Sequence, residues 1–184
     1  MENNESTAPE AQGAPEEEVV HRLSLGNKDD VYQICFAFIE NVSEIFVGAS
    51  TGEMPGEIAE EQMANVNEWL AAALLGQIPG IEPKEGWTGE GLARNLVAVL
   101  SGKIARLPRQ AQQELSSVNG VVMFSTMTFM HEVQEMLSSI NRVSEEEAAR
   151  AVEEQGRAMH ELCSKWADRF TGGGRPDIII PGSI

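Results

Sequence analysis

The chain has 184 residues, of which 29 are acidic and 13 are basic, so its formal charge at pH 7 is −16. This charge repels phosphate groups and anionic lipids, so direct binding to nucleic acid or to a membrane is not expected. The length suits one modest globular core. Two cysteines, Cys35 and Cys163, are too few for a disulfide framework. No secretory leader pattern opens the chain, and we therefore expect a cytoplasmic protein.

Residues 1–26 contain six glutamates and little apolar area, which predicts a disordered acidic tail. A short apolar patch near its end could pack down as an arm, but the alternation is too brief to predict a strand (Val19, Val20, Leu23 and Leu25). The remaining acidic residues leave the folded part negative as well.

Helical periodicity dominates residues 27–171, and we predict an all-α bundle of five to six helices in a single domain. The first helix starts at the capping residue Asn27 and runs to about Val47. The second starts at Pro55 and ends near Leu74. Residues 76–88 are rich in Pro and Gly and predict a connecting loop, which the apolar residues Ile81 and Trp87 hold to the domain.

A third helix is predicted from the cap Thr88 to Arg106, and a short one from Pro108 to Ser117. The most apolar helix is predicted at 121–141. Ser144 and Glu147 form a capping box that starts the last helix. The apolar residues of this helix follow a near-heptad spacing that favours self-association, so a homo-oligomer is possible (Ala148, Val152, Gln155, Met159, Leu162, Trp166 and Phe170).

The chain contains partial matches to catalytic and metal-binding motifs, but each lacks a neighbouring element or residue that the motif needs. Ser50 lies in a Gly-x-Ser-x-Gly match at 48–52, but a helix rather than a strand precedes it, so we interpret the match as an interhelical turn. His131 and His160 are each followed by Glu but lack the second histidine of a zinc-protease helix. No metal or cofactor is expected, and both cysteines are interpreted as buried small apolar residues.

The charged side chains on the helices are assigned to solvent-exposed faces, because charged residues are mostly exposed. This assignment covers two glutamate groups that would need to converge to bind a metal (Glu57, Glu60 and Glu61; Glu132 and Glu135). A small basic patch is expected to pair with neighbouring carboxylates such as Glu114 (Lys103, Arg106 and Arg109).

Three surfaces remain as functional leads. Methionines of the most apolar helix either fill the core or form an adaptable docking face. Residues 172–184 are predicted to be an extended tail, in which three glycines at 172–174 precede an Ile-rich segment. This tail either packs on its own domain or docks on a partner. The negative face either confers solubility or imitates a nucleic acid.

We therefore predict a non-enzymatic protein-interaction module that binds protein partners: an adaptor, an assembly chaperone or an assembly component. One alternative is an acidic inhibitor that blocks a basic nucleic-acid-binding protein. Another is a small helical enzyme that uses scattered residues such as His131, Glu135 and His160. The predicted partner-binding residues lie in the tail and on the last two long helices (Ile178, Ile179, Ile180, Ile184, Met127, Met130 and Trp166).

Overall fold

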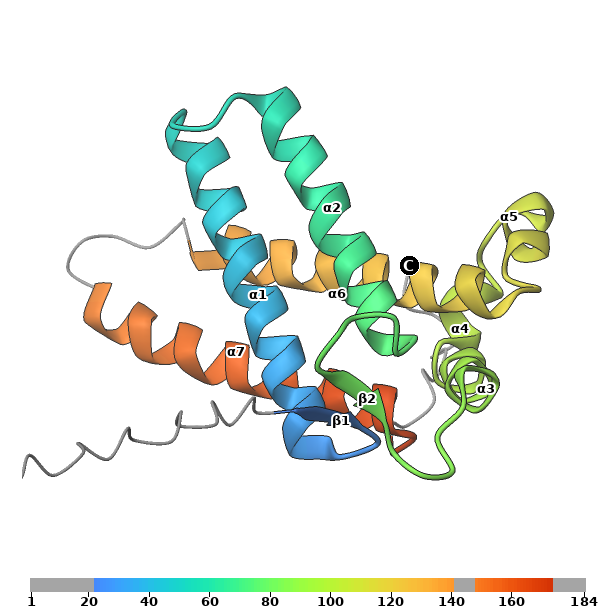
Figure 1. Ribbon diagram of the computed structural model, residues 1–184. Helices are drawn as coiled ribbons and strands as arrows, with labels where there is room; N and C mark the ends of the chain where they lie inside the picture. The colour runs from blue at the N-terminus through green and yellow to red at the C-terminus, as the bar shows by residue number, and fades with distance from the viewer. Residues whose placement is uncertain (1–21, 141–147, 174–184) are drawn as a thin grey trace, which may run out of the picture.

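The computed structural model describes residues 22–140 and 148–173, which form an all-α domain with one short pair of strands (Figure 1). The predicted fold class is confirmed. Seven helices are present in these two ranges. In chain order the elements are β1 (Leu23–Leu25), α1 (Lys28–Thr51), α2 (Gly56–Leu74), β2 (Ile81–Pro83), α3 (Gly89–Val99), α4 (Ser101–Ile104), α5 (Arg109–Glu114), α6 (Val118–Ile140) and α7 (Ala148–Thr171).

Helix α1 begins where the sequence predicts. The side chain of Asn27 accepts a hydrogen bond from the amide of Asp29 at 3.0 Å, which satisfies one free donor of the first turn. The helix runs past Val47 to Thr51 and stops at Gly52, whose φ of 77° is left-handed. The predicted end was therefore too early, because Ser50 and Thr51 continue the helix, with their hydroxyls bonded to carbonyls of the preceding turn.

The core lies where α1 packs against α7, α2 and α6. Its centre is aromatic: Phe129 lies 4.9 Å from Phe38 and 5.1 Å from Trp166 between ring centroids. Phe170 packs on the same Trp166 ring at 5.2 Å. Such ring pairs add to the stabilisation from burial. One described helix, α1, is long and apolar enough to cross a membrane by length and composition, a test that central helices of soluble proteins also pass.

At the end of the predicted tail, Leu23 and Leu25 pack on the domain as the arm that the sequence left open, and residues 1–21 lie outside the described residues. Leu23–Leu25 form β1, which pairs in parallel with β2 at 81–83. Leu25 and Ile81 are 1% and 6% exposed, so the short ladder closes one end of the core. Ile81 and Trp87 hold the loop to the domain as expected. The ladder was missed because three residues are too few for an alternating pattern to be recognised.

The third predicted helix is two helices, because the chain turns at Leu100 between α3 and α4. The predicted cap is confirmed, since the hydroxyl of Thr88 accepts from the amide of Gly91 at 3.0 Å. Helix α5 ends at Glu114, earlier than predicted, and α6 starts at Val118. Gly120 allows this close junction, because a Cβ there would overlap the carbonyl oxygen of Glu114.

The capping box at Ser144 and Glu147 lies outside the described residues. In the described part of α7 the near-heptad series is buried at Trp166 and Phe170, whereas Val152 is 67% exposed. The packing of this series therefore differs along the helix. Its C-terminal part belongs to the aromatic core.

Figure 1 shows α1 and α2 as an antiparallel hairpin that crosses α6, with the 52–55 connection at its far end. We call residues 40–68, which comprise the outer halves of both helices and the connection, the acidic hairpin.

Candidate functional site

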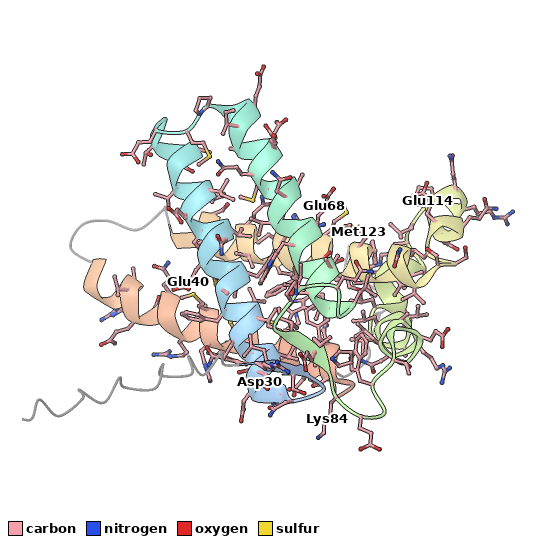
Figure 2. The ribbon with its side chains drawn as sticks, viewed as in Figure 1. Asp30, Glu40, Glu68, Lys84, Glu114 and Met123 are labelled. Atoms are coloured by element: carbon pink, nitrogen blue, oxygen red, sulfur yellow. The ribbon has the colours of Figure 1, made fainter. Side chains whose placement is uncertain are left out.

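The acidic hairpin carries nearly all the excess negative charge of the described residues. It contains seven glutamates and no Lys, Arg or His, whereas the other described residues hold twelve acidic and eleven basic side chains. All seven glutamates are exposed (Glu40, Glu44, Glu53, Glu57, Glu60, Glu61 and Glu68). Figure 2 labels Glu40 on α1 and Glu68 on α2. The predicted exposure of the three glutamates at 57–61 is confirmed.

No ion pair that the structure describes in residues 22–140 and 148–173 includes a carboxylate of the acidic hairpin. The described pairs join Arg22 to Glu82, Lys28 to Asp168, His131 to Glu135, and two lysines to Glu132. A region of one charge sign produces a field that extends into solvent. The hairpin therefore attracts cationic groups.

Three adjoining cavities of about 440, 270 and 250 Å³ line the acidic hairpin. Glu44 and Met54 border the first two, and Asn41, Asn65 and Val66 border the last two. The cavities therefore follow one another along α1 and α2, and we call them together the hairpin groove. Two large apolar side chains of the acidic hairpin are exposed, Val47 at 50% and Ile58 at 43%.

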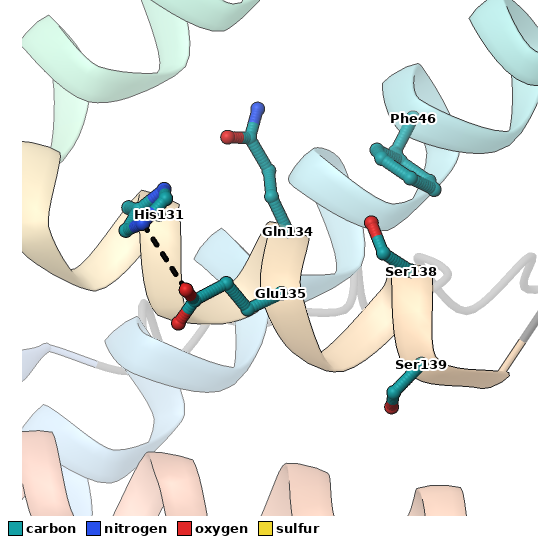
Figure 3. Close-up of a pocket in the computed structure, with 6 residues that line it drawn as sticks. All are labelled: Phe46, His131, Gln134, Glu135, Ser138 and Ser139. Atoms are coloured by element: carbon teal, nitrogen blue, oxygen red, sulfur yellow. Dashed lines mark ion pairs between the residues drawn. The ribbon is translucent and has the colours of Figure 1, made fainter. Parts of the chain in front are cut away.

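A fourth cavity, of about 540 Å³, lies between α1 and α6 (Figure 3). Phe46 borders it on α1, and polar residues of α6 form the rest of its lining (His131, Gln134, Glu135, Ser138 and Ser139). His131 and Glu135 pair at 3.3 Å, and both side chains are about two-thirds exposed. Water screens such a pair, so the two groups are weakly held.

The third residue of the enzyme alternative lies elsewhere. His160 is on α7, where its Nδ1 is 2.8 Å from the hydroxyl of Tyr32 on α1. The structure therefore brings together His131 and Glu135 but separates them from His160. Ser50 lies in the last turn of α1, and its hydroxyl donates to the carbonyl of Phe46 at 2.7 Å. This is not the strand-to-helix turn that a nucleophilic serine of that motif needs.

Cys35 and Cys163 are fully buried, as expected. Burial raises the pKa of the Cys35 thiol well above its ordinary value, and the nearby Cys163 raises it further. Burial also raises the pKa of Cys163, to about 11. Both thiols are thus protonated at neutral pH and are poor nucleophiles. The described residues contain no group of three or more His, Cys, Asp or Glu side chains that could hold a metal ion.

The predicted partner-binding residues are placed differently. Met127 is 58% exposed and fits a docking face, whereas Met130 is partly buried and packs against the core. Trp166 is 0% exposed, so no partner reaches it in this structure. The four isoleucines of the tail lie outside the described residues (Ile178, Ile179, Ile180 and Ile184).

One polar cluster was missed by sequence reasoning. The carboxylate of Glu132 accepts hydrogen bonds from Lys103 at 3.2 Å, Lys165 at 3.0 Å and the indole of Trp166 at 2.7 Å. We call these four residues the Glu132 cluster; it joins α4, α6 and α7. The assignment of Glu132 to a solvent-exposed face was wrong, since its side chain is only 14% exposed. The expectation that Lys103 pairs with a carboxylate is confirmed, but the partner is Glu132.

Burial alone would raise the pKa of Glu132. Hydrogen bonds from Lys165 and Trp166, together with the charges of Lys165 and Lys103, outweigh burial and lower this pKa below its ordinary value. The carboxylate is therefore ionised and already engaged by three donors at neutral pH. Because its donors come from α4 and α7, the cluster is a joint between helices rather than a free base.

The acidic hairpin is thus the strongest candidate site in the described ranges, because it combines exposed charge, exposed apolar groups and a groove. Comparison with known proteins adds no family to this description: no protein-family model, curated protein or solved structure matches the chain.

Proposed function

We propose that this chain is a non-enzymatic protein-interaction module, of the adaptor, assembly-chaperone or assembly-component kind, that binds a partner through the acidic hairpin. The observation that carries the proposal is the concentration of seven exposed glutamates, without any cation, on one helical hairpin. In the rest of the described chain acidic and basic groups nearly balance. Charge needed only for solubility has no reason to gather in one place.

The exposed apolar groups support the same surface. Interfaces need apolar contact area within a polar rim, and Val47 and Ile58 lie among the glutamates of the acidic hairpin. Met127 on α6 and the Ile-rich tail remain predicted contributors to partner binding.

Site-specific photo-crosslinking tests this function. A benzoylphenylalanine residue placed at Val47 or Ile58 in the full chain should give one discrete crosslinked partner in the native host. Val97 and Val152 are matched controls, because they are also exposed apolar positions, at 41% and 67%, but lie on α3 and α7. Equal crosslinking at all four positions, or none at Val47 and Ile58, would contradict the proposal.

A second candidate function uses the same surface: an inhibitor that occupies the nucleic-acid groove of a basic protein. The glutamates favour it because a row of carboxylates resembles a row of phosphates in charge. Competition separates the two candidates. A DNA duplex added before irradiation abolishes crosslinking to the partner if the chain is such an inhibitor, and leaves crosslinking unchanged if the partner binds elsewhere than through its nucleic-acid groove.

A further inference from the structure

The hairpin groove has a lining that selects its occupant. Ile45, Met54, Val66 and Trp69 provide apolar surface, of which Ile45 is buried and the other three are partly buried. Glu44 and Glu53 provide carboxylates. The groove is therefore an apolar channel edged with anionic hydrogen-bond acceptors.

The amide side chains of the groove add neutral polar groups to this lining. Asn41 donates one amide hydrogen to the carbonyl of Ala37 at 2.7 Å, which leaves its oxygen and its second N–H for an occupant. No Lys, Arg or His lies between Asp29 and Pro83 in the chain, so α1 after its first turn and all of α2 provide no cation beside the groove. Any positive charge in the groove must therefore come from the occupant.

The shape of the groove favours a helix as the occupant. It runs along two antiparallel helices, and along α1 it extends from Asn41 to Gly48, a rise of about 10 Å or two helical turns. No strand borders it, so there is no sheet edge on which an extended segment could add. A third helix laid between two others packs its side chains into the groove that they form.

Charge argues against the occupants that this chain itself could supply. A second acidic hairpin would place seven glutamates against seven others, and residues 1–21 carry six further glutamates. Residues 174–184 hold one basic and one acidic side chain, so they offer no net positive charge. The complementary occupant comes from another protein.

We propose that the hairpin groove binds a basic amphipathic helix of a partner protein, with one or two large apolar side chains on Val66 and Trp69 and with Lys or Arg against Glu44 and Glu53. This inference rests on the proposed function and specifies the partner at the same site. Helix-in-groove recognition by apolar anchors one turn apart is a recurrent mode of peptide binding.

A synthetic peptide of 18 residues tests the inference, with Leu and Lys placed so that one helical face is apolar; its length of about 27 Å exceeds the groove. Binding to the full chain is measured by fluorescence anisotropy of the labelled peptide. Two further peptides serve as controls: a scrambled one with the same composition and no apolar face, and one with Glu in place of every Lys. The first peptide should bind at least tenfold tighter than either control.

Two double variants separate the groove from general attraction. The E44Q/E53Q variant removes two charges that line the groove, and the matched E57Q/E60Q variant removes two that belong to the same hairpin but not to its lining. We expect the first to weaken binding about tenfold and the second less than about threefold. Dissolved salt screens the attraction between the peptide and glutamates that lie outside the groove more than the attraction at its lining. V66S should weaken binding by a similar factor to E44Q/E53Q, and V97S on α3 should not change it.

Equal effects of the two double variants would overturn the inference, because the attraction would then be diffuse. Equal affinity for the scrambled peptide would overturn the helical occupant, and binding of the acidic peptide would overturn the charge argument. If the peptide does not bind while crosslinking at Val47 and Ile58 succeeds, this inference fails and the proposed function stands. Circular dichroism of each variant checks that the fold is retained.

Discussion

The acidic hairpin and the Glu132 cluster use the same side chain in opposite ways. In the cluster, one carboxylate is 14% exposed and receives three hydrogen bonds from two other helices. In the hairpin, seven carboxylates are exposed and take part in none of the described ion pairs. A carboxylate saturated by the fold stabilises it, whereas a carboxylate left in solvent remains available to a partner. The charge that holds the fold together is therefore distinguishable here, by its surroundings, from the charge that we propose for partner binding.

Glu132→Ala should have the largest effect on this contrast. It leaves the indole of Trp166 without an acceptor in a largely buried place and removes the charge that holds two lysines together. We expect the free energy of unfolding to fall by about 2–4 kcal/mol. Urea denaturation measures it.

Glu68→Ala in the acidic hairpin is the matched control, since Glu68 is an exposed helical glutamate. Its effect should stay within about 0.5 kcal/mol. Comparable losses in both variants would mean that the hairpin glutamates also hold the fold together, and the distinction between the two regions would be lost.

The contribution of the Glu132 cluster to the free energy of unfolding should depend on pH. Because the pKa of Glu132 is lowered in the folded state, its ionised form contributes stability that is complete above the ordinary glutamate pKa and is lost as pH falls through the lower, folded value. The difference in unfolding free energy between the wild type and Glu132→Gln should therefore be constant from about pH 7 to about pH 5 and shrink below about pH 4. Urea midpoints over this range measure it.

A difference that stays the same at low pH would show that the shape of the Glu132 side chain stabilises the domain and that its charge does not. Glu68→Gln provides the comparison, because any pH trend that it shares with Glu132→Gln comes from the net charge of the chain.

Much of the fold follows from local signals in the sequence. Asn27 and Thr88 cap their helices as predicted, and the three-and-four spacing of apolar residues marks α1, α2, α6 and α7. The break at Leu100 and the β1–β2 ladder were missed, and the ladder depends on pairing between distant segments. Leu23 pairs with Ile81, 58 positions later, and no pattern within three residues indicates it.

The candidate site was predictable only in part. The sequence showed that the folded part is acidic, but the separation into an uncompensated hairpin and a balanced remainder requires knowing which helices pair. Trp166 was predicted to bind a partner but lies in the core. Its place in a regular apolar series fits a core and an interface equally well, and only its burial between Phe129 and Phe170 decides for the core.

The smallest expected effect is the change in unfolding free energy when glutamates are neutralised, and its sign should differ between the acidic hairpin and α7. Glu60, Glu61 and Glu68 have only like charges on the acidic hairpin, so E60Q/E61Q/E68Q should raise the free energy of unfolding by about 0.5–1 kcal/mol in low salt. On α7 the three glutamates of the matched variant E153Q/E154Q/E161Q lie three or four positions from basic residues (Arg150, Arg157 and Lys165). This variant removes the negative charges that attract those basic residues, so it should lower the free energy of unfolding by a similar amount.

Added salt tests whether electrostatic interactions cause these opposite changes in the free energy of unfolding. Both effects should fade as added salt shortens the range of the charges, since the side chains are exposed. Urea denaturation of the two triple variants in low and high salt measures the four values. If both variants were destabilised in low salt, the hairpin glutamates would have stabilising neighbours within the domain, and the charge that we assign to partner binding would belong to the fold.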